Sequence, residues 1–208
     1  MDKKCQLIKD VLDEMYPDAY CELNFSNELE LVIAVMLSAQ TTDKSVNKLT
    51  ETLFKKYQNI DDYLMVEQKD LENDLRRIGL YKNKAKNIKK MTEIIKNEYY
   101  GKIPNDRYAL ESLPGIGRKT ANVVLSCAFD IPTIAVDTHV ERIAKRLKLA
   151  YQNDSVLKVE EKLMKKFPKE SWSKLHHQLV FFGRYHCKAI NPNCDNCKLK
   201  SICCYPNL

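Results

Sequence analysis

The sequence predicts an all-α protein, and three observations support this. Apolar residues recur at intervals of three and four along most of the chain, which places them on one face of a helix. Residues that cap helices, such as Asp and Asn, precede several of these segments. No segment shows a convincing alternation of apolar and polar residues, the pattern of a half-buried strand.

Four helices are expected in the first half of the chain. Each has its apolar residues on one face, and in chain order they cover residues 7–15, 29–37, 43–57 and 85–101. Ser26 or Asn27 stands where the second helix needs a cap, and Asp43 is expected to cap the third. Gly101 is expected to end the fourth, because glycine readily takes the left-handed conformation found after helices.

The second half of the chain is expected to contain five more helices. Asn105 or Asp106 begins the first, and the second follows a Gly-rich turn and includes the apolar run at residues 121–125. The third follows Asp137, and the last two cover residues 156–167 and 172–187. A chain of 208 residues is long enough for one or two domains with a substantial core.

The chain is basic, with a formal net charge of +6. A surface of this charge favours a polyanion such as nucleic acid, although a lysine-rich organism would also produce it. The N-terminus lacks the apolar core of a signal peptide, and no run of eighteen apolar residues is present to span a membrane. We therefore expect a protein of the reducing cytoplasm with no membrane partner.

The most informative motif is Leu-Pro-Gly-Ile-Gly-Arg-Lys-Thr at residues 113–120. Gly115 and Gly117 permit a tight turn between two helices and let the backbone approach another surface closely. Backbone N–H groups at the start of the second helix can then bind a phosphate, with Arg118 beside them. Lys119 falls in the first helical turn, where the dipole disfavours an ammonium and so favours a nucleophilic amine. Taken alone, the motif also fits an ordinary helical hairpin with solvated charges.

A second motif, Val-Asp-Thr-His, places Asp137 about one short helix beyond Lys119. Taken alone, this aspartate is part of a helix N-terminus in which Thr138 and Glu141 form a capping box. His139 either orients the carboxylate or makes a structural hydrogen bond beside the cap. The motif becomes informative only together with the others.

A third motif consists of four cysteines near the C-terminus, with gaps of six, two and five residues between them: Cys187, Cys194, Cys197 and Cys203. In a reducing compartment, closely spaced cysteines bind metal more often than they form disulfides. Tetrahedral zinc and a four-iron cluster are both compatible with four thiolates. Zinc ribbons usually have two Cys-x-x-Cys pairs, whereas only one is present here, which favours iron–sulfur. Cys204 is the one competitor for a ligand position.

With these motifs in view, the chain resembles the endonuclease III family, helix–hairpin–helix DNA glycosylases that carry a [4Fe–4S] cluster. Residues 113–125 resemble the family's hairpin, and residues 134–139 resemble the segment that carries its aspartate. Residues 37–43 and 78–85 resemble two loops that the family inserts into DNA. The cysteine spacing is also that of the family, so the resemblance extends over almost the whole chain.

The resemblance implies two lobes with a DNA-binding groove between them. A six-helix domain would cover residues 22–130 and include the hairpin at about 113–118. Residues 1–21 would join residues 131–208 in a helical iron–sulfur domain with its cluster loop at 187–203. The [4Fe–4S] cluster would be held by Cys187, Cys194, Cys197 and Cys203.

The resemblance also implies a base-excision repair enzyme that removes oxidised pyrimidines from double-stranded DNA and nicks the strand 3′ to the abasic site. Lys119 would release the base and form a Schiff base that permits β-elimination, while Asp137 stabilises positive charge on the sugar. Gln40 and Leu80 would fill the space left by the extruded nucleotide. Further DNA contacts would come from Gly115, Gly117, Arg118 and His139. A monomer of bacterial type, associated with the nucleoid, is implied as well.

Two other functions fit parts of the sequence. A monofunctional glycosylase for mispaired adenine or thymine would look similar, but such relatives generally lack a lysine at the position of Lys119. A non-catalytic helix–hairpin–helix module with a structural metal would explain the turn and the cysteines. It would leave the pairing of Lys119 with Asp137 as a coincidence, so the sequence favours the bifunctional enzyme.

Overall fold

The structure is a computed structural model that describes residues 1–205, and these residues form helices and connecting loops without any β-strand. The all-α prediction is therefore confirmed. The chain divides into two compact units. Unit 1 consists of Met1–Cys21 and Asp130–Leu208, and unit 2 consists of Glu22–Phe129. None of the helices within residues 1–205 is both long and apolar enough to cross a membrane.

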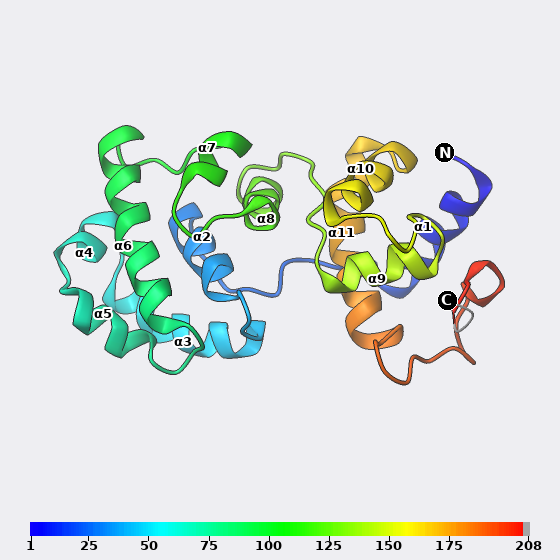
Figure 1. Cartoon of the computed structure of the whole chain (residues 1–208), viewed down its shortest axis with the longest axis horizontal. Coiled ribbons are helices and arrows are strands. Elements are labelled where there is room, and N and C mark those ends of the chain that lie inside the picture. The colour runs from blue at the N-terminus through cyan, green and yellow to red at the C-terminus, as the bar shows by residue number, and fades with distance from the viewer. Residues whose placement is uncertain (206–208) are drawn as a thin grey trace. The chain divides into compact units, whose positions relative to one another are not determined.

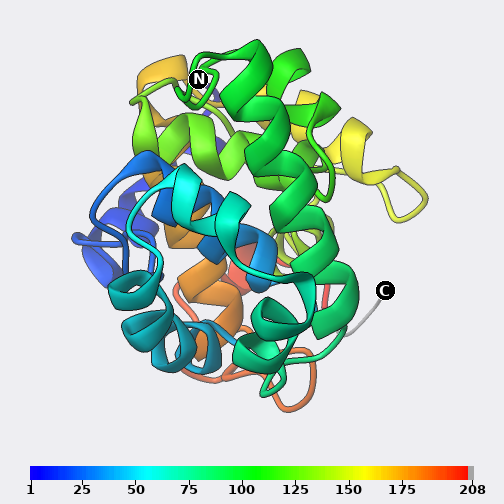
Figure 2. The same ribbon diagram turned by 90° about the vertical axis from the view of Figure 1, so that its left-hand side faces the viewer.

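Unit 2 holds seven helices, which Figure 1 labels and Figure 2 shows from the side of α4, α5 and α6. In chain order they are α2 (Glu28–Leu37), α3 (Asp43–Lys56), α4 (Ile60–Met65), α5 (Gln68–Leu75), α6 (Tyr81–Glu98), α7 (Arg107–Ser112) and α8 (Arg118–Ala128). Residues 31–37 of α2 are all buried, and this helix packs against α3, α6 and α8. The apolar run that predicted a core helix therefore forms the centre of the unit.

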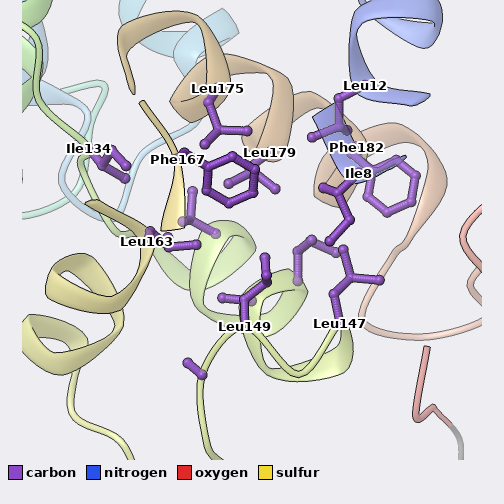
Figure 3. Packing of buried hydrophobic residues seen from close by; sticks show 14 of the residues in the cluster. Ile8, Leu12, Ile134, Leu147, Leu149, Leu163, Phe167, Leu175, Leu179 and Phe182 are labelled. Carbon is purple, nitrogen blue, oxygen red and sulfur yellow. The ribbon is translucent and has the colours of Figure 1, made fainter. Parts of the chain in front are cut away.

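Unit 1 is assembled from both ends of the chain. Its elements are α1 (Lys3–Met15), α9 (Thr138–Arg146), α10 (Val156–Lys166), the 3₁₀-helix η1 (Lys169–Ser171), α11 (Trp172–Phe181), the π-helix η2 (Phe182–His186) and the 3₁₀-helix η3 (Lys200–Ile202). Their apolar faces meet in one core, part of which Figure 3 shows. Ile8 and Leu12 of α1 lie there beside Phe182, which is distant in sequence.

A polar contact also ties α1 to α11 in unit 1. The Gln178 side-chain nitrogen donates to Asp13 Oδ1 at 2.9 Å and to the Tyr16 carbonyl at 3.2 Å. Asp13 also pairs with Lys9 at 2.6 Å and with Lys174 at 2.9 Å. Burial alone would raise the pKa of the Asp13 carboxyl, but hydrogen bonds from Lys9, Gln178 and Lys174 outweigh it and hold that pKa well below its ordinary value.

The predicted caps are partly confirmed. Asn27 caps α2 by accepting a hydrogen bond from Glu30 N at 2.9 Å. The prediction that Asp43 caps the next helix is wrong. Thr42 is the cap, and Asp43 is the first helical residue, where its charge suits the positive end of the dipole.

One expected helix has different bounds from those predicted, and unit 2 has a different number of helices. The expected helix over 172–187 is α-helical only to Phe181 and continues as a single π-helical turn. Within that turn Gly183 lies close to α9, because a Cβ there would come within 2.8 Å of the His139 Cβ. Unit 2 has seven helices where six were expected, and residues 60–75 contribute two of them because Val66 and Glu67 are extended.

Candidate functional site

The hairpin motif forms the connection between α7 and α8. Leu113 and Ile116 are buried and anchor the turn, in which Ile116 N donates to the Leu113 carbonyl at 3.1 Å. Gly115 has φ +83°, and a Cβ at this position would lie 2.8 Å from the Asn87 side chain. Both the left-handed backbone and the close approach to α6 therefore require glycine at Gly115.

The start of α8 places Lys119 as predicted, in the first helical turn. Gly117 is the N-cap and has no side chain with which to satisfy the first N–H groups of the helix. Lys119 is exposed at the second helical position. Arg118 precedes it and lies 4.0 Å from Glu111 of α7, an ion pair that joins the two helices of the hairpin.

Asp137 is itself the N-cap of α9 in unit 1. Its Oδ1 accepts hydrogen bonds from His139 N and Val140 N, both at 2.8 Å. The predicted capping box of Thr138 and Glu141 is therefore wrong, since Thr138 is already the first helical residue. Both capping bonds go to Oδ1, and neither uses the second carboxylate oxygen.

His139 lies half-buried against a neighbouring arginine. Its Nδ1 is 3.3 Å from Arg142 Nη2. The same Arg142 Nη2 donates to the Gly183 carbonyl at 2.6 Å. Arg142 reaches further, to the carbonyl of Cys187, at 3.3 Å from Nε and 3.1 Å from Nη2. Burial lowers the pKa of the Arg142 guanidinium, and the nearby Arg146 adds to this. Arg142 thus links the start of α9 to the segment that leads into the cysteines.

The four cysteines singled out by their spacing line one cavity of about 220 Å³. His186, Tyr205 and Lys200 complete much of its wall. Burial raises the pKa of the Cys187 and Cys197 thiols, because a lone thiolate is poorly solvated there. A positively charged group in the cavity would favour the thiolates.

The dimensions of the cavity suit a cluster better than one ion. Zinc binds four thiolates at about 2.3 Å from each sulfur, which leaves no open volume among them. A polynuclear group that spans the space between the sulfurs therefore fits the four cysteines.

Arg146 and Cys204 explain why one of two adjacent cysteines faces the cavity. Arg146 is 6% exposed, and its Nη1 donates to Cys187 Sγ at 3.2 Å and to the Lys188 carbonyl at 2.8 Å. Cys204 N donates to the Arg146 carbonyl at 2.9 Å, and Cys204 Sγ lies 3.0 Å from the same oxygen. Cys204 is thereby turned toward the end of α9, whereas Cys203 lines the cavity.

The sequence did not single out Arg142 as a site residue, and it gave no reason to set Arg146 apart from other charged residues. Both lie on α9 among other charged residues, where arginine is ordinarily a solvated side chain. Only the fold of unit 1 brings them to the carbonyls around the first cysteine.

Gln40 and Leu80, the two expected wedge residues, share an unusual backbone conformation. Gln40 has φ 56° and Leu80 has φ 58°, and both side chains are exposed. A positive φ is unfavourable for residues other than glycine, so the surroundings must hold these positions. Both residues belong to unit 2, in the loop after α2 and at the N-cap of α6.

Comparison with protein families matches residues 33–169 to the HhH-GPD superfamily of base excision DNA repair proteins. Among curated proteins, the chain is 56% identical to endonuclease III of Bacillus subtilis over 201 residues, which are 97% of this chain and 92% of the relative. It is 46% identical to endonuclease III of Escherichia coli K12 over 194 residues, covering 93% and 92% of the two chains.

The fold is also similar to that of a solved enzyme–DNA complex. The structure of a trapped endonuclease III–DNA covalent intermediate, an estranged-adenine complex, superposes with a TM-score of 0.93 at 54% sequence identity. The match covers 98% of this chain and 96% of the other. Sequence and fold therefore point to the same relatives.

Proposed function

Since the chain belongs to the endonuclease III family of base-excision repair enzymes, and is a DNA glycosylase and AP lyase, we propose that its substrate is double-stranded DNA containing an oxidised pyrimidine or an abasic site. This proposal is carried by one observation: the Lys119 side chain is exposed in the first turn of α8, directly after the hairpin whose Gly117 caps that helix. We further propose that the protein is a monomer and that it is associated with the bacterial nucleoid.

Lys119 is proposed as the nucleophile. Its amine attacks C1′ of the sugar, the bond from C1′ to the base breaks, and the base leaves with a proton. The C1′–O4′ bond then breaks, O4′ takes a proton from solvent, and the open sugar is left as an iminium between Lys119 and C1′. The iminium acidifies the C2′ proton, and loss of that proton expels the 3′ phosphate by β-elimination. One amine thereby supports both base removal and strand nicking.

Asp137 is proposed to act on the charge that develops in this reaction. Positive charge builds on the sugar as the glycosidic bond breaks, and a carboxylate stabilises such a charge. Its capping bonds support this role, because both go to Oδ1 and neither uses Oδ2.

The hairpin is proposed to hold the DNA backbone without reading its sequence. Gly115 and Gly117 let a phosphate approach the first N–H groups of α8, and Arg118 adds a positive charge beside them. His139 remains a proposed DNA contact, although its bond with Arg142 gives its ring a structural role as well.

Gln40 and Leu80 are proposed as the wedges that replace the extruded nucleotide. An enzyme of this kind must take the damaged nucleotide out of the stack, and the gap must be filled. One polar and one apolar side chain, both exposed at loop positions with positive φ, suit that task.

Cys187, Cys194, Cys197 and Cys203 are proposed to hold a [4Fe–4S] cluster. The fit rests on their shared cavity and on Arg146, which donates a hydrogen bond to the first sulfur. When bound, the cluster supplies structure, since four thiolates leave no open coordination position for hydrolytic chemistry. These residues would close the loop after η2 into one fixed shape.

Borohydride trapping tests the substrate and the chemistry together. The wild-type protein is incubated with a duplex oligonucleotide that contains one oxidised pyrimidine, and borohydride reduces the iminium to a stable amine. A covalent protein–DNA adduct is the expected result. Base release without an adduct would instead support a monofunctional glycosylase, and absence of both would contradict the proposed substrate.

A further inference from the structure

Lys84 is a buried lysine whose amine contacts the loop that carries Gln40. The residue is 4% exposed, and burial lowers the pKa of its amine. Its Nζ lies 2.9 Å from the Leu37 carbonyl, 2.8 Å from the Ala39 carbonyl and 3.0 Å from Thr41 Oγ1. An ammonium has three N–H donors, and all three find an acceptor in this one loop.

These contacts complete the C-terminal end of α2. The last four carbonyls of a helix have no partner within it. Here the carbonyls of residues 34–36 accept hydrogen bonds from Ser38 and Ala39, and the Leu37 carbonyl accepts its bond from Lys84. A positive charge is also favourable at this end of a helix dipole. Lys84 therefore fixes the backbone on both sides of Ser38, directly before Gln40.

The same lysine belongs to the helix that begins at Leu80. Leu80 is the N-cap of α6, and Lys84 N donates to its carbonyl at 3.0 Å. Lys84 is thus one helical turn from one expected wedge, and its amine binds the residue next to the other. Both wedges have a positive φ, a conformation that persists only where neighbouring contacts enforce it.

We propose that Lys84 is a positioning residue that fixes Gln40 and Leu80 relative to each other, so that both can enter the duplex when the damaged nucleotide leaves it. The inference rests on the proposed wedge function of these two residues. Because the loops are held before DNA binds, less conformational freedom is lost when the wedges enter.

Lys89 provides a matched control on the same helix. Its Nζ also donates to two backbone carbonyls, those of Leu64 at 3.0 Å and Val66. These carbonyls lie at the end of α4, in a segment with no expected wedge. Replacing either lysine by methionine removes an amine that bridges a loop to α6 and leaves most of the apolar stem.

The test compares nicking of one abasic site in a duplex with nicking of the same site in a single-stranded oligonucleotide, where no gap must be filled. The duplex-to-single-strand rate ratio is expected to fall by about 10- to 100-fold in Lys84→Met, as for misplaced positioning groups. It is expected to keep the wild-type value in Lys89→Met. Thr41→Val removes one acceptor, keeps Lys84, and is expected to lower the ratio by a smaller factor.

A double variant distinguishes the positioning role of Lys84 from the wedge function of Gln40. If Lys84 acts through Gln40, the double variant Gln40→Ala with Lys84→Met should lose much less than the product of the two single effects. An unchanged ratio in Gln40→Ala would show that the wedge function is wrong.

A lowered ratio in Gln40→Ala with an unchanged ratio in Lys84→Met would overturn the role of Lys84. Equal losses on both substrates in Lys84→Met would overturn it as well. If Lys84→Met does not fold, an unchanged duplex-to-single-strand ratio in Thr41→Val would overturn the role of Lys84.

Discussion

In the proposed mechanism the reaction depends on one nitrogen atom at Lys119, whose place at the second position of α8 is fixed by the glycine N-cap before it. Lys119→Gln is expected to abolish base release, strand nicking and borohydride trapping, because an amide is not a nucleophile. Binding to damaged duplex should stay close to wild type, since the proposed phosphate contacts are those of the hairpin backbone and not of the Lys119 side chain. Trapping and gel-shift assays check both, and an adduct formed by the variant would identify another amine as the nucleophile.

At Asp137 two roles can be separated by two substitutions. Asparagine caps helices about as well as aspartate but carries no charge, so Asp137→Asn should keep the stability of α9 and slow base release by roughly 100-fold or more. Asp137→Ala loses the cap as well, which costs about 1 kcal/mol of stability. Single-turnover kinetics and urea unfolding measure the two effects, and normal turnover in Asp137→Asn would leave only the capping role.

Sequence reasoning at this scale found local roles and missed long-range partners. The place of Lys119 follows from its own neighbours, the two glycines before it. The roles of Lys84 and Arg146 could not be found this way, because their acceptors are far away in sequence. Leu37 is 47 residues from Lys84, and Lys188 is 42 residues from Arg146. A lysine on an amphipathic helix is predicted to be solvated unless the fold is known.

At the scale of elements, the sequence predicts long helices better than short ones. The long amphipathic helix α6 was expected from its own pattern, whereas α4 and α5, with 6 and 8 residues, are too short to show a clear period. The single π-helical turn at Phe182–His186 has no local signature in the sequence. The fold shows instead that Gly183 in this turn lies against α9.

The cysteine loop gives a prediction that separates adjacent thiols. The purified protein should contain about four irons per chain and absorb visible light through thiolate-to-iron charge transfer. Cys203→Ser should lose iron, because Cys203 lines the cavity with the other three cysteines. Cys204→Ser should keep it, because Cys204 points to the end of α9.

Elemental analysis of anaerobically prepared protein measures this difference. Stoichiometric zinc without iron would contradict the cluster, and loss of iron in Cys204→Ser alone would show that the fourth ligand is Cys204.

At the scale of the molecule, the stability of unit 1 should depend on pH through Asp13. A carboxyl whose pKa is lowered in the folded state stabilises that state above its unfolded pKa of about 4, and the contribution is lost as the pH falls toward the folded pKa. Asp13→Asn should therefore lower the free energy of unfolding at pH 7 and weaken its fall on acidification below pH 4. Urea unfolding over this pH range tests it, and parallel curves for the two proteins would contradict it.

Because unit 1 is built from both ends of the chain, its two parts are synthesised at different times. Synthesis reaches Cys21 well before Asp130, and at about 5–20 residues per second the intervening 108 positions take roughly 5–20 s. Unit 2 can fold during this interval, whereas the apolar face of α1, with Ile8 and Leu12, must wait for α11. Rapid folding of these two units therefore begins with unit 2, and α1, although it is synthesised before unit 2, is among the last helices to be packed.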